Sequence, residues 1–279
     1  MSLMDFFSQV NNMNASQLQA FIDSNKEGGF TLLDVRQPME YENARIPGSK
    51  LIPLPVLNDR LSELDPQKPV IAYWAAGRRS RAAAQILTSR GFEQVYNLKG
   101  GIAAWQGHAA AGPSEMGMIL LKGNETPREV ICLAYGLEEG LRKFYSMSIK
   151  LAIGTAVVGV LTKLAKIEVK HKQRLFDLYL TIEPVPLGVD AFEKRITSEF
   201  MEGGFDPDKF LEQSMPALKT AAEVLDFAMM LEAQAMDLYM RYAEKSEDPE
   251  VKNILYQMAN EEKAHLKSLG HILDKNAVD

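Results

Sequence analysis

Residues 164–171 read LAKIEVKH and residues 258–265 read MANEEKAH, so the chain contains a Glu-x-x-His motif twice. Glu262 and His265 follow Glu168 and His171 by the same 94 residues. In an α-helix, residues three positions apart lie on one face and about one turn apart along the axis. Each motif therefore predicts a helix that presents a carboxylate and an imidazole to the same neighbour.

The same offset relates two pairs of residues upstream, Glu138 with Glu232 and Tyr145 with Tyr239. Around these positions, four long helical patterns are predicted, over about 127–150, 156–180, 216–246 and 249–274. The connection between the second and third patterns spans some 35 residues and contains EPVPLG and EGGFDPD. One long crossover in the middle of a four-helix bundle is the ferritin-like arrangement.

A bundle of this kind would gather four carboxylates and two imidazoles at its centre, which is the ligand set of di-iron and di-manganese carboxylate proteins. An isolated Glu-x-x-His motif is common on solvated helices, but two copies beside apolar residues favour a metal site, because a buried unpaired carboxylate is costly. Ligands without sulfur suit iron or manganese, and zinc can occupy them too. The predicted ligands are Glu138, Glu168, His171, Glu232, Glu262 and His265. Tyr145 and Tyr239 are interpreted either as hydrogen-bond donors to these carboxylates or as ordinary core tyrosines.

Composition limits the other possibilities. The 279 residues carry 31 basic and 37 acidic side chains, a net charge of −6 that argues against a nucleic-acid-binding surface. The single cysteine, Cys132, excludes an internal disulfide, a zinc–thiolate cluster and a four-cysteine iron site. The longest apolar run, 151–161, is shorter than the roughly 20 residues of a membrane-spanning helix. The first residues lack the pattern of a signal peptide, so we expect a cytoplasmic protein without a membrane anchor.

Upstream of the helical patterns, short apolar runs alternate with helix-like stretches between about residues 17 and 105. The runs TLLDV, KLIPL, PVIAYW and QVYNL predict strands of an α/β domain with a mostly parallel sheet. The stretch that follows, HAAAGPSEMGMILLKGNETP, is rich in glycine, proline and small residues. We therefore predict an α/β domain over residues 1–108, a linker over 109–126 and a four-helix bundle over 127–279.

The helical half resembles the rubrerythrin-like, or erythrin, branch of the ferritin-like superfamily. The resemblance rests on AYGLEEGLRKFY, LAKIEVKH, MLEAQAMDLY and MANEEKAH. It implies that the six predicted ligands bind two irons, with Glu168 and Glu262 as candidate bridges, and that the site reduces peroxide or oxidises ferrous iron with oxygen. Glu139 and Glu261 are adjacent carboxylates, but they lack the shared offset.

Two departures from the family bear on its activity. Peroxide-reducing rubrerythrins carry a further glutamate three residues after the third-helix ligand, where this chain has Ala235. They also carry a cysteine-rich rubredoxin module, which the single cysteine excludes. The resemblance thus implies an external electron donor protein, and it also implies a homodimer, for which the run 151–161 is a candidate contact surface.

The first domain resembles a rhodanese, or sulfurtransferase, domain over about residues 5–108, through LLDVRQPMEYENARIPGS, YWAAGRRS and NLKGGIAAW. In that family a cysteine opens the active-site loop. Trp74 stands at this position, so we predict that no persulfide forms and that the domain has no sulfurtransferase activity. Cys132 is interpreted as a small buried hydrophobe that does not replace it.

The rest of this loop precedes a predicted helix, whose amino terminus favours anions. The candidate anion-binding residues are Ala75, Ala76, Gly77, Arg78 and Arg79. Alternatively, the two arginines are solvated or pair with Asp34 and Glu40, and Trp74 fills the pocket, which would leave the domain as a binding or regulatory module.

The sequence thus favours a non-haem di-iron oxidoreductase that reacts with peroxide or oxygen. The alternative is an iron-sequestering or iron-sensing protein with little turnover.

Overall fold

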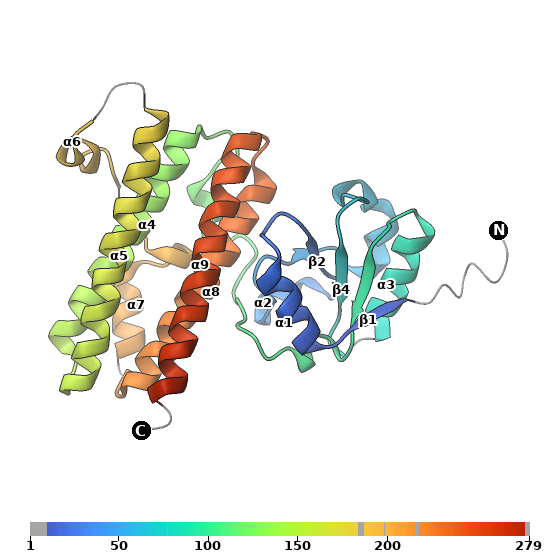
Figure 1. Ribbon diagram of the computed structural model, residues 1–279, viewed down its shortest axis with the longest axis horizontal. Coiled ribbons are helices and arrows are strands. Elements are labelled where there is room, and N and C mark those ends of the chain that lie inside the picture. The colour runs from blue at the N-terminus through green and yellow to red at the C-terminus, as the bar shows by residue number, and fades with distance from the viewer. Residues whose placement is uncertain (1–9, 77, 184–186, 198, 216–217, 277–279) are drawn as a thin grey trace. The chain divides into compact units, whose positions relative to one another are not determined.

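The computed structural model describes residues 10–276, with the exception of 77, 184–186, 198 and 216–217 (Figure 1). The chain forms two compact units, Met1–Ser114 and Glu115–Asp279, and the division falls inside the segment 109–126. Each unit has its own hydrophobic core, and each is described by itself below.

The first unit is built on a parallel sheet, which in the described residues has the strand order β1-β5-β4-β2-β3. The four apolar runs form the predicted strands β2 (Thr31–Asp34), β3 (Lys50–Leu51), β4 (Val70–Tyr73) and β5 (Val95–Leu98). The sequence did not indicate the edge strand β1 (Asn11–Met13), which pairs with β5. The α/β class and the parallel pairing are therefore confirmed.

Helices cover both faces of this sheet, as the alternation of side chains along β4 requires. Val70 and Ala72 share a core with α3 (Arg78–Ser89), whereas Ile71 and Tyr73 share one with α1 (Ala15–Ser24). The short α2 (Pro38–Asn43) and the 3-10 segments η2 (Leu54–Asp59), η3 (Leu61–Glu63) and η4 (Gly101–Ala104) complete the connections.

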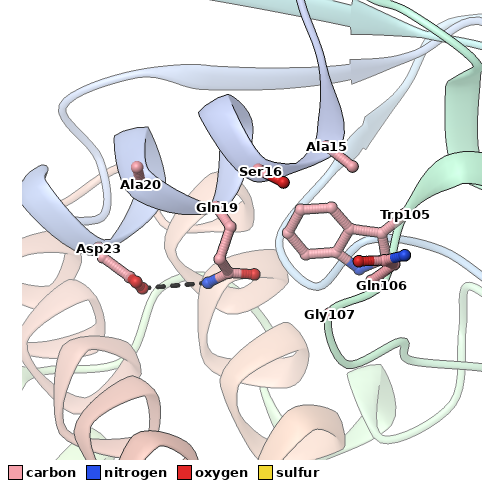
Figure 2. Close-up of a pocket in the computed structure, with 8 residues that line it drawn as sticks. All are labelled: Ala15, Ser16, Gln19, Ala20, Asp23, Trp105, Gln106 and Gly107. Carbon is pink, nitrogen blue, oxygen red and sulfur yellow. Dashed lines mark hydrogen bonds between the residues drawn. The ribbon is translucent and has the colours of Figure 1, made fainter.

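A shallow groove runs between α1 and residues 105–107 (Figure 2). In it, Gln19 Nε2 donates a hydrogen bond to Asp23 Oδ1 at 3.0 Å. Trp105 forms the other wall, and its Nε1 donates to the carbonyl of His108 at 2.9 Å. The groove holds none of the predicted site residues.

The second unit contains the four predicted long helices: α4 (Pro127–Leu151), α5 (Thr155–Ile182), α8 (Ala221–Lys245) and α9 (Pro249–Asn276). α8 begins at Ala221, five residues later than predicted, because Thr220 and Glu223 form a capping box there. Residues 216 and 217 lie outside the described residues. The crossover from α5 to α8 contains α6 (Val189–Glu193), η6 (Glu202–Gly204) and α7 (Pro207–Ser214).

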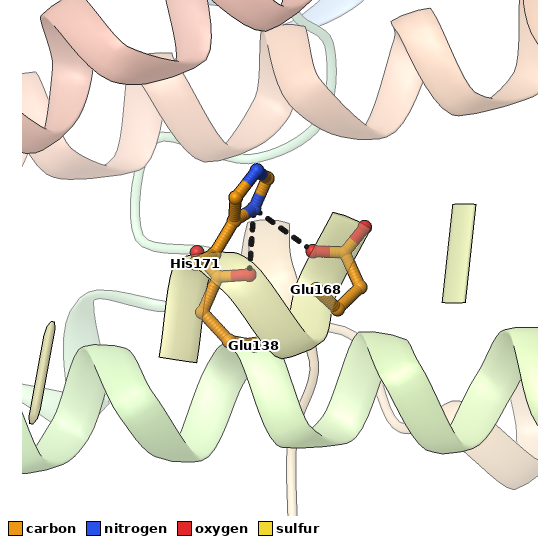
Figure 3. Close-up of side chains that lie close together, drawn as sticks. All are labelled: Glu138, Glu168 and His171. Carbon is orange, nitrogen blue, oxygen red and sulfur yellow. Dashed lines mark hydrogen bonds and ion pairs between the residues drawn. The ribbon is translucent and has the colours of Figure 1, made fainter. Parts of the chain in front are cut away.

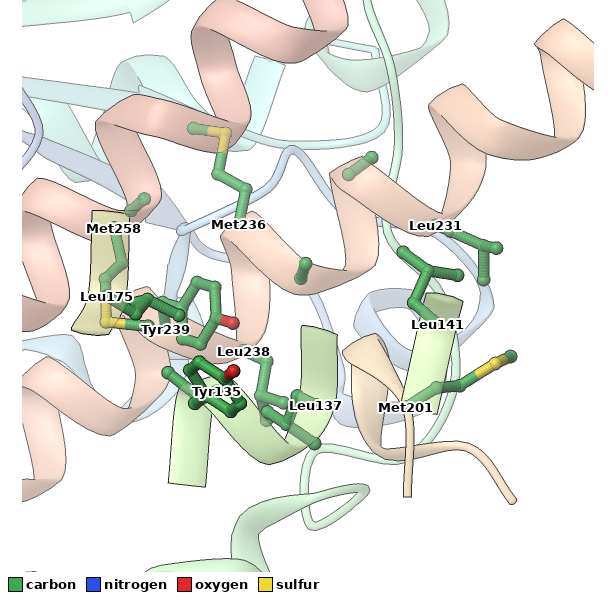
Figure 4. Packing of buried hydrophobic residues seen from close by; sticks show 14 of the residues in the cluster. Tyr135, Leu137, Leu141, Leu175, Met201, Leu231, Met236, Leu238, Tyr239 and Met258 are labelled. Atoms are coloured by element: carbon green, nitrogen blue, oxygen red, sulfur yellow. The ribbon is translucent and has the colours of Figure 1, made fainter. Parts of the chain in front are cut away.

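Buried residues of all four long helices form one hydrophobic core (Figure 4). The segment before α4 also belongs to this unit. It includes η5 (Met118–Leu120), and the Tyr242 hydroxyl of α8 donates to the Gly117 carbonyl at 2.6 Å. Arg241 pairs with the fully buried Asp237 at 2.9 Å and donates to the Met116 carbonyl at 3.1 Å.

The apolar run 151–161 divides between core and surface. Val157 and Leu161 are buried in the bundle core, whereas Leu151 and Ile153, at the turn between α4 and α5, are 57% and 90% exposed. A dimer contact at this turn stays a prediction. None of the helices in the described part of the chain is apolar over the length that crossing a membrane requires.

Candidate metal centre

The first half of the repeat forms a buried cluster between α4 and α5. His171 Nδ1 lies 3.3 Å from Glu138 Oε2 and 3.0 Å from Glu168 Oε2 (Figure 3). The exposed fractions of these residues are 5%, 3% and 0% respectively. Their ligand atoms all lie within 4.8 Å of one another, close enough to bind one metal ion together.

The second half of the repeat forms the same cluster between α8 and α9. His265 Nδ1 lies 2.8 Å from Glu262 Oε2 and 3.5 Å from Glu232 Oε2. The two imidazole rings stack, with 3.9 Å between the centroids of His171 and His265 and 5° between the ring planes. The fold therefore brings all six predicted ligands together as two adjacent, equivalent clusters.

The two clusters also interact electrostatically. Burial raises the pKa of Glu138 and of Glu168 to about 8, and the negative charge of Glu232 contributes to the shift of Glu168. Burial would also raise the pKa of Glu232. Hydrogen bonds with His265 and Glu262 have a larger combined effect, so the pKa of Glu232 is lowered. Removing four carboxylates from water at one place is unfavourable unless positive charge compensates them.

Unsatisfied oxygen atoms indicate where this positive charge belongs. Both carboxylate oxygens of Glu168, and Oε2 of Glu232, are buried and accept no hydrogen bond of good geometry from the described residues, although an imidazole Nδ1 lies 3.0 Å from Glu168 Oε2 and another 3.5 Å from Glu232 Oε2. Buried polar atoms without a partner are rare in folded proteins. Two cations held by these oxygens and the two imidazoles would satisfy them, and a ligand set of oxygen and nitrogen suits iron or manganese. The residues therefore fit a pair of metal ions.

The neighbouring carboxylate Glu139 belongs to a different network. It accepts hydrogen bonds from Arg142 at 2.7 Å and from Lys172 at 2.7 Å. Burial acts to raise its pKa, but these two cations hold it at about 2. Lys172 also donates to Glu193 of α6 at 3.2 Å, so Lys172 links Glu139 of the bundle to the crossover.

The two tyrosines of the repeat are buried in the bundle core, at 0% exposure for Tyr145 and 1% for Tyr239. Their predicted hydrogen bonds to the ligand carboxylates stay a prediction. Ala235, at the position of the seventh ligand in peroxide-reducing rubrerythrins, is also fully buried.

One part of the site was not anticipated from the sequence: the crossover presses against α4 on either side of Glu138. A Cβ atom on Gly136 would overlap the Thr197 carbonyl oxygen, and one on Gly140 would overlap the carbonyl oxygen of Phe200. The Gly-x-x-x-Gly spacing around Glu138 was a visible signal of this close approach.

In the first unit, Trp74 follows β4 at the start of the predicted loop. The carbonyls of Trp74 and Ala75 accept hydrogen bonds from the Ile102 and Ala103 amides at 2.8 and 3.2 Å, and Ala76 is exposed. The guanidinium of Arg79 lies over the Trp74 ring, 4.6 Å from its centroid. This contact is a cation–π interaction between the first residue of the loop and the first turn of α3.

Asp34 is fully buried and forms a 2.6 Å ion pair with Arg36, whereas Arg79 is exposed; pairing of the loop arginines with Asp34 and Glu40 stays a prediction. Gly77 and the side chain of Arg78 lie outside the described residues, so anion binding at this loop stays a prediction. Cys132 lies on α4, half-buried against the bundle core, and burial raises the pKa of its thiol. An uncharged thiol is a poor nucleophile, which agrees with its interpretation as a small hydrophobe.

Fold and site together define a class of protein in which a parallel-sheet α/β domain precedes a helical bundle with paired carboxylate and imidazole ligands. Comparisons with known proteins identify both parts. A family model described as a rhodanese-like domain matches residues 14–108, and one described as rubrerythrin matches residues 223–279. The chain belongs to the rhodanese-like family through its first unit and carries a rubrerythrin domain in its second.

Three similar proteins each match between 28% and 39% of this chain. The Bacillus subtilis protein YqhL is 44% identical over 80 residues, which are 29% of this chain and 64% of that protein. An Allochromatium vinosum protein named sulfurtransferase is 36% identical over 77 residues, 28% of this chain and 72% of its own. The crystal structure of the Alr3790 protein from Anabaena is 33% identical, with a TM-score of 0.35, and covers 39% of this chain and all of that one. The chain spans between 26% and 72% of the length of such curated relatives.

The rubrerythrin match covers α8 and α9, and therefore Glu232, Glu262 and His265. The 94-residue repeat places the equivalent residues on α4 and α5. The rubrerythrin domain and the two clusters together point to a di-iron protein.

Proposed function

We propose that this chain is a di-iron oxidoreductase that reduces peroxide or oxygen, with the rhodanese-like unit as a binding or regulatory module. The observation that carries the proposal is the pair of buried clusters joined by the stacked rings of His171 and His265. An iron pair bound there would supply two electrons at one place, which a two-electron oxidant requires.

The residues of the chain have separate tasks in this proposal. Glu138 and Glu232 would each help to hold one metal ion, and Glu168 and Glu262 are the candidates to interact with both. Both histidines direct Nδ1 at the carboxylates. The buried core around them excludes bulk water, which strengthens the attraction between carboxylates and cations. The four carboxylates would balance the positive charge of a bound metal pair.

The electrons for repeated turnover would come from an external donor protein, because one cysteine cannot provide a rubredoxin site. The buried Ala235 leaves the centre with six ligands. This feature favours an alternative in which the protein sequesters or senses iron with little turnover, and kinetics separate the two possibilities.

We expect anaerobic ferrous loading of the full-length protein to give close to two irons per chain. The ferrous protein is then mixed with peroxide and, separately, with oxygen in a stopped-flow instrument. At least one of the two reagents should oxidise it within seconds, because the predicted ligands are already in place around the metal pair. A metal content below half an ion per chain would exclude the di-iron centre. Full loading with slow oxidation by both reagents would favour sequestration.

For the rhodanese-like unit, we expect only background rates of sulfur transfer from thiosulfate to cyanide. The indole of Trp74 has no ionisable group that can form a persulfide, and Arg79 stacks on its face. The matched variant Trp74→Cys restores a thiol at the same position and tests whether the loop itself is competent. Turnover by the wild-type protein would refute this part of the proposal.

A further inference from the structure

Two of the four helices that surround the candidate metal centre are covered by other segments of the same unit. The crossover lies against α4 at Gly136 and Gly140. On α8, Gly203 of η6 approaches Gln234, and Gly117 approaches Leu238, so closely that a Cβ on either glycine would need a shift. On α4 the crowding atoms are backbone carbonyls, and on α8 they are side-chain atoms, so both helices are covered on these faces.

The opposite side, between α5 and α9, has a groove of about 480 Å³ that leads to the ligands. Its lining includes His171, His265 and Glu232, so one residue of each half and both imidazoles face it. The His265 side chain is 15% exposed, whereas the side chains of the other five ligands are at most 5% exposed. The most accessible ligand of the centre therefore lies in this groove.

The charges that line the groove favour some ligands over others. On α5, the exposed residues Lys170 and Arg174 lie one turn apart. The acidic residues in the lining are Glu261 of α9 and the predicted ligand Glu232 of α8. Apart from the predicted ligands, the lining carries two cations and one carboxylate, and a net positive charge at an entrance raises the local concentration of anions.

We propose that the groove between α5 and α9 is the entrance through which a small neutral or anionic oxidant of the peroxide class reaches the metal pair, with Lys170 and Arg174 attracting anionic ligands. This inference rests on the proposed function, because it assigns a route to the same centre. Ala264 lines the groove beside His265 and is exposed, so a large side chain at this position can fill the groove without disturbing the core.

The test uses azide, a small anion that binds open positions of ferric sites and produces a visible absorption band. In iron-loaded, oxidised full-length protein, Ala264→Trp should slow azide association roughly tenfold or more, because the ligand then waits for the groove to open. The matched control is Lys267→Trp, an exposed position on the same helix outside the groove lining. It should bind azide at the wild-type rate.

A second variant tests the charges. The double variant Lys170→Glu, Arg174→Glu should slow azide association about tenfold at low salt and much less at high salt, because exposed charges are screened. Equal azide rates in wild type, Ala264→Trp and the double variant, at equal iron content, would overturn the proposed entrance.

A metal-free measurement separates failure of the entrance from failure of the di-iron proposal. In the apo-protein, diethyl pyrocarbonate should modify His265 before the more deeply buried His171, and Ala264→Trp should slow this modification several-fold. Absence of iron in the wild type would refute the proposed function while this experiment still decides the route. Modification of His265 at the same rate in both proteins would count against the groove.

Discussion

Glu168→Ala is expected to abolish paired-metal binding, so that the iron content falls from about two ions per chain to at most about one. Glu168 is fully buried, neither of its oxygens accepts a hydrogen bond of good geometry from the described residues, and Glu232 of the other cluster acts on it electrostatically. It is therefore the carboxylate best placed to interact with both ions. Iron analysis after anaerobic ferrous loading measures the effect, and Glu262→Ala should behave in the same way.

The conservative variant Glu168→Gln separates loss of metal from loss of structure. The amide keeps the size of the side chain and, like the protonated carboxyl that a pKa of about 8 implies at neutral pH, carries no charge; its NH₂ group can donate to the neighbouring carboxylates. We expect the metal-free variant to be as stable as the metal-free wild type, or more stable by about 1 kcal/mol in the free energy of unfolding. Denaturant titration of both apo-proteins gives this comparison.

Glu139→Gln is the matched control, because it makes the same chemical change at a carboxylate outside the cluster. It weakens the bonds to Arg142 and Lys172, so it should lower stability but leave the iron content unchanged. Full iron loading of Glu168→Gln, or loss of iron in Glu139→Gln, would show that the ligand assignment is wrong.

The sequence predicted which six residues lie together, because a shared metal site would constrain their spacing. Glu and His must lie three residues apart to face the same way on a helix, and the second half must repeat the geometry of the first to surround a second ion. These requirements leave a trace in the sequence, the common offset of 94 residues. Glu139 and Glu261 lack this offset, and the structure indeed engages Glu139 with Arg142 and Lys172.

Contacts that depend on how separate segments fold together were harder to predict from the sequence. The strand β1 reads NNM, which has no apolar alternation, and part of its support is a hydrogen bond of 2.7 Å from Asn97 Nδ2 to Asn12 Oδ1, two residues far apart in the chain. The stacking of Arg79 on Trp74 likewise depends on the turn between β4 and α3. Neither contact follows from a local pattern, so neither could be read from the sequence.

The close approach of the crossover to α4 leads to the second prediction. Gly140→Ala adds a single methyl group, yet its Cβ would overlap the Phe200 carbonyl oxygen and crowd the Met201 Cα at 2.8 Å. These are backbone atoms, so relief requires the crossover to move away from α4. We expect a loss of about 1–3 kcal/mol in the free energy of unfolding, typical of overpacking in a core. Because Glu138 lies between Gly136 and Gly140, the iron content should fall as well.

A glycine-to-alanine substitution on an open helix face should instead raise the free energy of unfolding. Gly159 lies in α5, is exposed, and has no atom within 4 Å of an added Cβ. Alanine restricts the unfolded chain more than glycine does and favours the helix, so Gly159→Ala should raise the free energy of unfolding by about 0.5–1 kcal/mol. If Gly140→Ala also stabilised the apo-protein and kept its iron, the crossover would not press on α4, and access to the metal centre would no longer be restricted to the groove between α5 and α9. The stability of the glycine variants therefore tests whether the crossover covers the α4 side of the centre. Azide binding by the groove variants tests whether the side between α5 and α9 is open.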